Sequence, residues 1–325
     1  MRDKPPFTIT SEILNLVADI SEQVGRLEAS ALNASPQLRK QNRIKTITGT
    51  LAIEGNTLTE EQITAIVDGQ RVMGTARELA EVQGAIAAYD ALPDLQPHSI
   101  EDLLRAHGLM MAEVLTSPGA FRNKAVGIHK GGAVQHVPPP AHQVSGLMAE
   151  LCGWLAQSQD HPLITSSVFH YELEFIHPFS DGNGRMGRLW QTLILSQWHP
   201  LFLSLPLESV IKDHQHAYYQ ALEQADQQAE STPFIHFMLS VIAQSLTQNA
   251  PVNAPQNAPV NVEGLKTPDA ILRLLQSDAG LTRQQIATIL GKDVRTVARA
   301  IARLQQAGSL RRIGSDKAGH WQVQR

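Results

Sequence analysis

Residues 177–188 read HPFSDGNGRMGR, and apolar residues with helical spacing lie on both sides of this stretch, over 168–176 and 185–197. A glycine-containing loop that opens a helix presents unpaired backbone N–H groups and the positive end of the helix dipole, and both favour an anion such as phosphate. Arg185 and Arg188 lie three residues apart, hence on one helical face, where guanidinium groups suit phosphate oxygens. The stretch therefore predicts a phosphate-binding site at a helix N-terminus.

Two further side chains in this stretch suit metal binding and proton transfer. Asp181 directly precedes the glycines, where its carboxylate is placed to hold the Mg²⁺ ion that accompanies a nucleotide. His177 is the group that can accept a proton near neutral pH. A glycine turn, a histidine or a pair of arginines is ordinary by itself, but their combination within twelve residues favours a functional site.

The same glycines also fit a different nucleotide site. Gly182, Gly184 and Gly187 match the dinucleotide fingerprint Gly-x-Gly-x-x-Gly. That fingerprint needs a strand immediately before it, whereas the preceding segment predicts a helix. The dinucleotide interpretation is therefore the weaker one.

A metal site in a helical bundle is a further alternative. His170, Glu174 and His177 are spaced four and three residues apart on one helical face, which suits a metal ion. A di-metal bundle needs a second Glu-x-x-His, and none accompanies the first. The metal site stays open only as the less favoured alternative.

The composition is that of a folded protein, because hydrophobic residues make up 42% of the 325 residues and charged residues 18%. At roughly 100–200 residues per domain, the length predicts two domains or three. No run of about 18 uncharged apolar residues occurs, so we expect no membrane span, and the first residues lack the apolar core of a secretion signal. The single cysteine, Cys152, can form no internal disulfide, so we expect a cytoplasmic protein.

The net charge of −4 hides an uneven distribution. Residues 265–325 contain 11 Lys and Arg against 4 Asp and Glu, a balance of +7, which leaves −11 on residues 1–264. Between these parts, residues 248–264 include a thrice-repeated Asn-Ala-Pro. This low-complexity segment predicts an extended linker between an acidic and a basic domain.

The residues before this linker favour helices nearly throughout. Apolar residues recur at intervals of three and four, for example at Ile13, Leu16, Val17 and Ile20. The exception is the stretch 125–137, in which two short alternating runs flank Gly131-Gly132. This pattern predicts a β-hairpin.

Residues 265–325 predict three helices, the second capped by Thr282 and the third by Asp293, followed by two short strands, the order of a winged helix-turn-helix domain. Arginines recur every four residues on the third helix and lie on the predicted wing: Arg295, Arg299, Arg303, Arg311 and Arg312. This basic pattern suits contact with DNA phosphates. A winged helix also serves as a protein-interaction module, and both alternatives stay open.

As a whole, residues 177–188 resemble the signature of the Fic (filamentation induced by cAMP) family, His-x-Phe-x-Asp/Glu-Gly-Asn-Gly-Arg-x-x-Arg, at every specified position. The resemblance extends over about residues 1–247. It implies a mainly α fold, a Fic-fold helical bundle with the hairpin as a flap, followed by the small winged helix-turn-helix domain. The domains expected are an N-terminal helical region over 1–95, a catalytic core over 96–247, the linker over 248–264 and the winged-helix domain over 265–325.

The resemblance implies a protein adenylyltransferase, which transfers AMP from ATP to a Ser, Thr or Tyr hydroxyl of a protein and releases pyrophosphate. By this similarity His177 would take the proton of the hydroxyl, Asp181 would hold Mg²⁺ on the phosphates, and Phe179 would anchor the loop in the core. Tyr219 would line the adenine pocket, near Asp226 at a position where the family often has Asn. The anion hole would consist of Gly182, Asn183, Gly184 and Arg185.

The predicted hairpin resembles the flap of the family, which holds a target segment beside the active site by strand addition. The docking residues implied are Val126, Gly127, Ile128 and His129. The partner implied is a protein with an accessible hydroxyl, which includes this chain itself, and a homodimer also stays open.

The segment Thr50-Leu51-Ala52-Ile53-Glu54-Gly55 resembles the inhibitory motif of the family, Ser/Thr-x-x-x-Glu-Gly/Asn, at the end of a helix expected over about residues 38–55. Thr50 and Glu54 are one turn apart on the same face, and Gly55 is a natural helix stop. By resemblance, Glu54 would pair with Arg188 and remove the guanidinium that meets the γ-phosphate of ATP. Removal of AMP from a modified protein, with Glu54 activating water, is a second activity that the resemblance leaves open.

Overall fold

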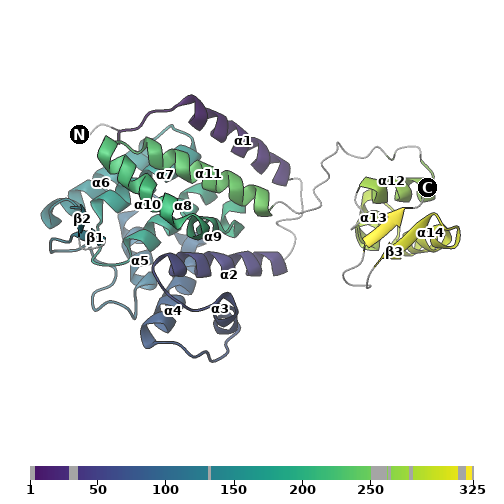
Figure 1. Ribbon diagram of the computed structural model, residues 1–325, viewed down its shortest axis with the longest axis horizontal. Coiled ribbons are helices and arrows are strands. Elements are labelled where there is room, and N and C mark those ends of the chain that lie inside the picture. The colour runs from purple at the N-terminus through teal and green to yellow at the C-terminus, as the bar shows by residue number, and fades with distance from the viewer. Residues whose placement is uncertain are drawn as a thin grey trace. The chain divides into compact units, whose positions relative to one another are not determined.

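The computed structural model describes residues 4–28, 36–130, 133–249, 262, 265–277, 281–313 and 320–323. The chain divides into two compact units, residues 1–249 and residues 250–325 (Figure 1). Each unit has a hydrophobic core of its own.

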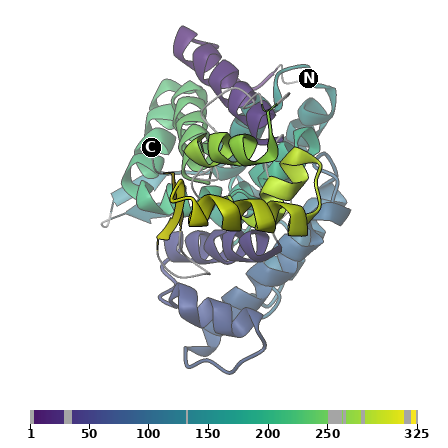
Figure 2. The same ribbon diagram turned by 90° about the vertical axis from the view of Figure 1, so that its right-hand side faces the viewer.

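The first unit consists of helices with one short β-hairpin between α5 and α6 (Figure 1). In chain order its elements are α1 (Ser11–Glu28), α2 (Pro36–Ile53), α3 (Glu60–Val67), α4 (Ala76–Ala91), the short 3₁₀ helix η2 (Leu92–Asp94), α5 (Ile100–Met110), β1 (Ile128–Lys130), β2 (Ala133–His136), α6 (Ala141–Gln157), α7 (Pro162–Ile176), α8 (Asn183–Trp198), the 3₁₀ helix η3 (Pro200–Ser204), α9 (Leu207–Asp213), α10 (Gln215–Gln228) and α11 (Thr232–Asn249). Helix α1 packs along α11, and α3 lies at the opposite end of the unit in both views (Figures 1 and 2).

Helices α7 and α8 form the centre of this unit. Their side chains are buried on nearly every side, including Phe169 and Leu173 of α7 and Leu189 and Trp190 of α8. A helix that is apolar around its circumference is stable only when other elements surround it. The loop 177–182 is therefore anchored between two largely buried helices.

Helix α2 lies against α9 at a glycine. A Cβ atom at Gly49 would lie 2.6 Å from the backbone carbonyl carbon of Glu208, so only glycine allows the two helices to approach this closely. Ile47 and Leu51 of α2 are buried in the same core as α7 and α8. The close packing of α2 on α9 at Gly49 places the last turn of α2 beside α8.

Strands β1 and β2 form the antiparallel hairpin that the sequence predicts within 125–137. Ile128 pairs with His136, His129 with Val134, and a register shift lies between Ile128 and His129. The connecting Gly131 and Gly132 fall outside the described residues, as do the side chains of both strands.

The second unit has the order predicted for a winged helix-turn-helix: α12 (Thr267–Ser277), α13 (Arg283–Leu290), α14 (Val294–Gln306), β3 (Leu310–Ile313) and β4 (His320–Val323), with β3 and β4 antiparallel. Both predicted helix caps are present. The Thr282 hydroxyl accepts the N–H of Gln285, and the Asp293 carboxylate accepts that of Arg295.

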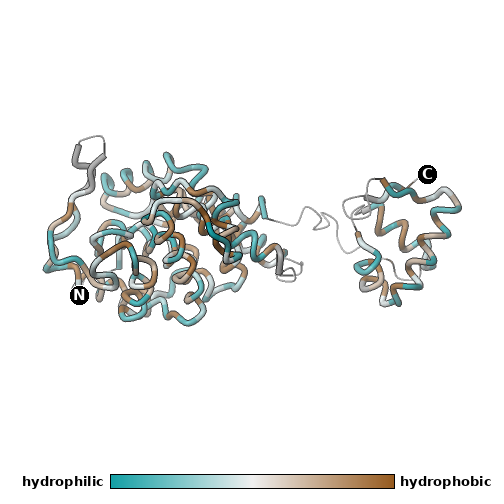
Figure 3. Tube along the Cα trace, turned by 90° about the horizontal axis from the view of Figure 1, so that it is seen from below, coloured by the Kyte–Doolittle hydropathy of each residue, from teal (hydrophilic) through white to brown (hydrophobic). Residues whose placement is uncertain are grey.

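Apolar residues recur along the helices of both units, which is the pattern of amphipathic helices that enclose a core (Figure 3). The structure confirms the predicted fold class, mainly α with a small hairpin and a C-terminal winged helix-turn-helix. Within the described part of the chain, no helix is both long enough and apolar enough to cross a membrane.

Candidate active site

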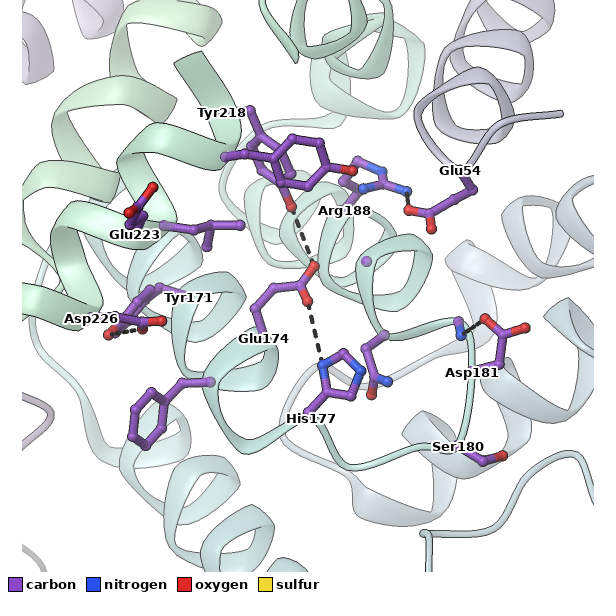
Figure 4. A pocket seen from close by; sticks show the side chains of 16 residues that line it. Glu54, Tyr171, Glu174, His177, Ser180, Asp181, Arg188, Tyr218, Glu223 and Asp226 are labelled. Atoms are coloured by element: carbon purple, nitrogen blue, oxygen red, sulfur yellow. Dashed lines mark hydrogen bonds and ion pairs between the residues drawn. The ribbon is translucent and has the colours of Figure 1, made fainter. Parts of the chain in front are cut away.

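A cavity of about 460 Å³ opens where α7, α8, α10 and the end of α2 meet (Figure 4). Most residues that the sequence predicts for the site line it, although they come from distant segments: Glu54, His177, Asp181, Gly182, Asn183, Gly184, Arg188 and Tyr219. Mostly aromatic and acidic residues complete the lining: Tyr171, Glu174, Phe175, Ser180, Tyr218, Leu222, Glu223 and Asp226. The predicted site residues Thr50 and Arg185 are buried and do not line the cavity.

The loop between α7 and α8 begins and ends in left-handed backbone conformations. His177 has a φ of 50° and caps α7, with its N–H bonded to the carbonyl of Leu173. Gly182 has a φ of 88° and directly precedes α8. A left-handed backbone is unfavourable for a histidine, so the surrounding contacts must hold it, as they often do at active sites.

Asn183, the first residue of α8, fixes the shape of this loop. Its side-chain Oδ1 accepts the N–H of Phe179 at 2.9 Å, and its Nδ2 donates to the Phe179 carbonyl at 3.0 Å. Phe179 is fully buried, as predicted. Because the side chain of Asn183 is used within the loop, its backbone N–H is the group that it can offer to an anion, together with the other N–H groups of the first turn.

Sequence reasoning missed Arg122, a buried residue that holds the end of α7. Its guanidinium donates to the carbonyl oxygens of His177 at 2.7 Å and Pro139 at 2.6 Å, and to that of Ile176 at 3.2 Å. The bonds to His177 and Ile176 satisfy carbonyl groups that the end of α7 leaves without helical partners, and the bond to Pro139 ties this end to the segment before α6. Arg122 lies 55 residues before His177 and belongs to no motif, so the sequence carried no signal for it.

Sequence reasoning also missed His107, which supports the loop from α5. Its ring stacks on Phe179 with centroids 3.8 Å apart. Nδ1 accepts the N–H of Gly119 at 2.9 Å, which leaves Nε2 protonated to donate to the Asp181 carbonyl at 3.1 Å. Burial lowers the pKa of His107 to about 4, so the ring is neutral near pH 7.

Arg188 pairs with the end of α2, the contact that the resemblance implies. Its Nη2 lies 2.6 Å from Oε1 of Glu54, its Nε donates to the Thr50 hydroxyl at 3.0 Å, and the Thr50 carbonyl accepts a third bond at 3.3 Å. Burial is the largest effect on Arg188 and opposes its charge, but Glu54, together with Tyr218 and Glu174, raises its pKa above the ordinary value. The guanidinium is 1% exposed and Glu54 28% exposed, so the pair is reachable only from the side of Glu54.

Helix α2 ends at Ile53, directly before the residue that pairs with Arg188. The N–H of Asn56 bonds to the Leu51 carbonyl and the N–H of Gly55 to that of Ala52, which is the Schellman arrangement. Gly55 has a φ of 90°, in agreement with its predicted role as a helix stop.

Asp181 accepts hydrogen bonds on both carboxylate oxygens. Oδ1 accepts the N–H of Gly182 at 2.7 Å and lies 3.2 Å from Nη2 of Arg185, while Oδ2 lies 3.0 Å from Nη2 of Arg77. Arg185 and Arg77 also pair with Glu81 of α4, at 3.6 Å and 3.1 Å. The guanidinium of Arg185 thus lies among carboxylates, and its predicted phosphate contact stays a prediction.

The residues around Asp181 fit a Mg²⁺ ion that enters with a nucleotide. Magnesium is commonly held by one or two carboxylates together with substrate phosphates. Asp181 is about one third exposed, lines the cavity and stands beside the N-terminus of α8. Among the described residues no group of three or more His, Cys, Asp or Glu side chains could hold a metal ion, so a Mg²⁺ ion at Asp181 would take its other ligands from phosphates and water.

The far end of the cavity is aromatic and acidic. Tyr219 lines it beside Tyr218, with ring centroids 5.3 Å apart. The hydroxyl of Tyr171 donates to Oδ1 of Asp226 at 2.9 Å. Flat side chains beside the phosphate end suit a nucleobase, which is the role predicted for Tyr219.

His170 is engaged in a way that argues against the helical metal site. Its Nδ1 lies 2.6 Å from Oε1 of Gln191, and its Nε2 lies 3.1 Å from the hydroxyl oxygen of Tyr218. Burial lowers the pKa of His170 to about 3. Both ring nitrogens therefore serve the core packing of α7, α8 and α10.

The predicted flap residues do not line the cavity. Val126 is partly buried and Gly127 exposed, while Ile128 and His129 lie on β1, where the structure describes the backbone alone. Their role in target docking stays a prediction.

Comparison with known proteins places these residues in a family. Residues 97–195 match the model of the Fic/DOC family, and residues 270–310 match that of the winged helix-turn-helix DNA-binding family. The protein adenylyltransferases Fic of Culex quinquefasciatus and Aedes aegypti are both 30% identical, over 72% and 66% of this chain. The chain spans less than half the length of these curated relatives, 46% and 43%.

Solved structures include a protein that matches along nearly its whole length. The crystal structure of a Fic family protein from Desulfovibrio desulfuricans G20 is 41% identical, with a TM-score of 0.74, over 99% of this chain and 98% of that one. Fic-1 from C. elegans, at 23% identity and a TM-score of 0.58, shares the fold over 73% of this chain. From the signature loop, the cavity and this match, we conclude that the chain belongs to the Fic family.

Proposed function

We propose that this chain is a protein adenylyltransferase, which transfers AMP from ATP to a Ser, Thr or Tyr hydroxyl of a protein and releases pyrophosphate. The observation that carries the proposal is the meeting of His177, Asp181 and the N-terminus of α8 in one cavity with an aromatic far end. The names of the curated relatives support the same reaction.

In the proposed reaction the backbone N–H groups at the start of α8 bind phosphate oxygens, in the place where negative charge develops. His177 takes the proton of the target hydroxyl. The hydroxyl oxygen forms a bond to the α-phosphorus as the bond from that phosphorus to the leaving pyrophosphate breaks. Most of the rate enhancement then comes from positioning and charge stabilisation.

Asp181 is the residue that would hold Mg²⁺ on the phosphates, where the ion would neutralise part of their charge. The ion pair between Arg77 and Asp181 has to open for this role. Arg77 is 65% exposed, so it can leave at little cost.

We also propose that Glu54 inhibits the enzyme. Its carboxylate engages Arg188 and lies against the start of α8, because a Cβ atom at Gly184 would be 2.7 Å from Oε1 of Glu54. Glu54 thus competes with a nucleotide twice, for the guanidinium and for the space beside the backbone N–H groups. An arginine–carboxylate pair with one partly exposed partner is strong enough to bias nucleotide binding, and a modest movement of the segment after α2 can open it.

Glu54→Gly, His177→Ala and the double variant test these two proposals together. Each is incubated with ATP labelled at the α-phosphorus, Mg²⁺ and a protein lysate, and label on protein is read by gel autoradiography. We expect weak labelling by the wild type, labelling at least 10-fold stronger by Glu54→Gly, and none by either variant that lacks His177. Equal labelling by Glu54→Gly and the wild type would contradict inhibition, and labelling that survives His177→Ala would contradict the mechanism.

A second proposal for the same cavity is removal of AMP, with Glu54 activating water. Glu54 is a partly exposed carboxylate that lines the cavity and lies against the start of α8, where a general base would reach water beside the phosphates. An AMP-modified target is incubated with the wild type and with Glu54→Gln. Loss of AMP with the wild type alone would support this activity, whereas equal loss or no loss with both would contradict it.

For the second unit we propose DNA binding. Arg295, Arg299 and Arg303 are exposed on α14, opposite the buried Val297 and Ile301. A row of exposed arginines on the third helix of a winged helix-turn-helix suits contact with phosphates. A gel mobility shift at two salt concentrations tests this. Binding that weakens with salt and with Arg299→Ala is expected, and no shift at low salt would contradict it.

A further inference from the structure

Glu174 is an acidic residue of the cavity to which the proposed reaction gives no role. It lies on the last turn of α7, and its Oε2 is 3.9 Å from Nδ1 of His177 (Figure 4). The left-handed backbone of His177 ends the helix and leaves its imidazole beside this last turn. Glu174 thus lines the cavity and shares an ion-pair contact with the proposed general base.

The other oxygen of Glu174 is fixed by the core. The hydroxyl of Tyr218 donates to Oε1 at 3.3 Å, and the same hydroxyl lies 3.1 Å from Nε2 of His170. Tyr218 and His170 are both buried, so this chain of contacts is anchored away from solvent. The carboxylate is therefore oriented, with one oxygen towards Tyr218 and the other towards His177.

Burial strengthens the effect of Glu174 on its neighbour. The side chains of Glu174 and His177 are 13% and 20% exposed, and charges interact more strongly there than in water. Other ionisable groups also face this region, namely Glu54 from the end of α2, Arg188 from α8 and Tyr219 from α10. Glu54 pairs with Arg188, whereas Glu174 has an ion-pair contact with His177 itself.

We propose that Glu174 is the positioning residue of His177. In the complex with substrate, Oε2 accepts the N–H of Nδ1, and this leaves Nε2 as the acceptor for the hydroxyl proton. When that proton moves to Nε2, the imidazolium carries a positive charge that the ionised carboxylate stabilises, as in the acid–histidine pairs of other enzymes. The proposal rests on the proposed function, because it takes His177 as the base of the transfer.

A rival role predicts the opposite result. Oε1 of Glu174 would lie 3.2 Å from a Cβ atom at Gly184, so the carboxylate also stands near the expected phosphates. If its main effect were repulsion of ATP, Glu174→Gln would bind ATP more tightly and transfer AMP faster. As a positioning residue, Glu174 leaves ATP affinity nearly unchanged and its loss slows the chemical step.

The test compares Glu174→Gln with Glu172→Gln, the same change two residues earlier on α7 and outside the cavity, both in the Glu54→Gly background. We expect Glu174→Gln to lower kcat roughly 10- to 100-fold, with the KM for ATP within about 2-fold and the control unchanged. The pH profile moves as well, because the pKa of the His177 imidazole falls by about one unit when the carboxylate is lost. Tighter ATP binding with equal or faster transfer would overturn the proposal.

A second measurement does not depend on activity. The imidazole of His177 is titrated by NMR in the full-length protein, with His177→Ala identifying its signals. A lower pKa and a changed proton position on the ring in Glu174→Gln support the proposal, and unchanged values overturn it. If Glu54→Gly transfers no AMP, the proposed function fails while the titration still decides whether Glu174 acts on His177. Thermal unfolding of each variant checks that the fold is intact.

Discussion

The loop between α7 and α8 and the segment that follows α2 meet at one cavity but are held in different ways. The loop is fastened by buried groups, with Asn183 inside it and Arg122 and His107 around it. The Glu54 side chain, just after α2, is partly exposed and pairs with Arg188. The backbone around it is fastened as well, because Gln215 donates to the Ile53 carbonyl and Asn56 donates to the Glu81 carboxylate. The proposed active site is thus preorganised, and the proposed inhibitor, Glu54, can leave Arg188 by a movement of its own side chain.

The largest effect on the loop between α7 and α8 is expected from Arg122→Ala. It removes the bonds to the carbonyl groups of His177 and Ile176 at the end of α7 and of Pro139 before α6, and leaves those carbonyls without this donor. We expect the free energy of unfolding to fall by about 3–4 kcal/mol, measured by urea denaturation, and MgATP binding to be lost. Arg105→Ala is the control, since Arg105 is half exposed and its carboxylate contact is 3.9 Å long. Equal stability of the two variants would mean that the loop does not depend on Arg122.

The second largest effect is expected from acid, which should destabilise the protein through His107, a residue that supports the loop. The imidazole of His107 takes up its proton near pH 6.5 in the unfolded chain but only near pH 4 in the folded one, so stability is lost as the pH falls between these values. We expect this group to lower the free energy of unfolding by about 3 kcal/mol over that window. His170, whose pKa burial lowers to about 3, acts in the same direction from about pH 6.5 down to about pH 3.

His107→Gln isolates the contribution of His107. The variant cannot titrate at this position, so its stability should change less between pH 6.5 and pH 4 than that of the wild type. Urea denaturation at several pH values measures the difference, and parallel curves would contradict the assignment.

A smaller effect is expected from a change at Thr50, which bonds to Arg188 beside the proposed inhibitory residue Glu54. Thr50→Val keeps the shape of the side chain but removes the hydroxyl that accepts from Nε of Arg188. We expect AMP transfer to rise roughly 3- to 10-fold, because about 1 kcal/mol of the pair is lost. Thr48→Val, two residues earlier on α2, should change nothing. A silent Thr50→Val beside an activating Glu54→Gly would show that Glu54 inhibits alone.

The smallest effect is expected at the proposed metal position. Arg77→Gln removes an exposed partner of Asp181, so the Mg²⁺ concentration that supports half-maximal ATP binding should fall by about 2-fold. Calorimetric titration of ATP at several Mg²⁺ concentrations measures it, with Arg105→Gln as control. A rise in the Mg²⁺ requirement would mean that Arg77 helps to bind the nucleotide.

The fold class and most residues of the cavity could be predicted from the sequence, because both depend on local patterns. The twelve residues from His177 to Arg188 predict a loop, a helix start and an anion site together, and Gly55 predicts the end of α2. The caps Thr282 and Asp293 likewise lie directly beside the helices that they start.

The residues that escaped prediction act through contacts between distant segments. Arg122 and His107 reach the loop from 55 and 74 residues away, and neither belongs to a repeating pattern. Spacing placed Arg185 and Arg188 on one face, but the partners of each came from elsewhere, Glu81 for Arg185 and Glu54 for Arg188. Glu174 was visible only as a candidate metal ligand, because the left-handed turn at His177 could not be read from spacing.

The glycine seat of α2 has a consequence for how such an enzyme could be switched on. A methyl group at position 49 cannot fit against the backbone of α9 unless the two helices separate. Such a separation would displace the end of α2, and with it the Glu54 carboxylate that pairs with Arg188, without replacing any residue that lines the cavity. The proposed inhibition would therefore depend on a position outside the cavity, where one added carbon would change it.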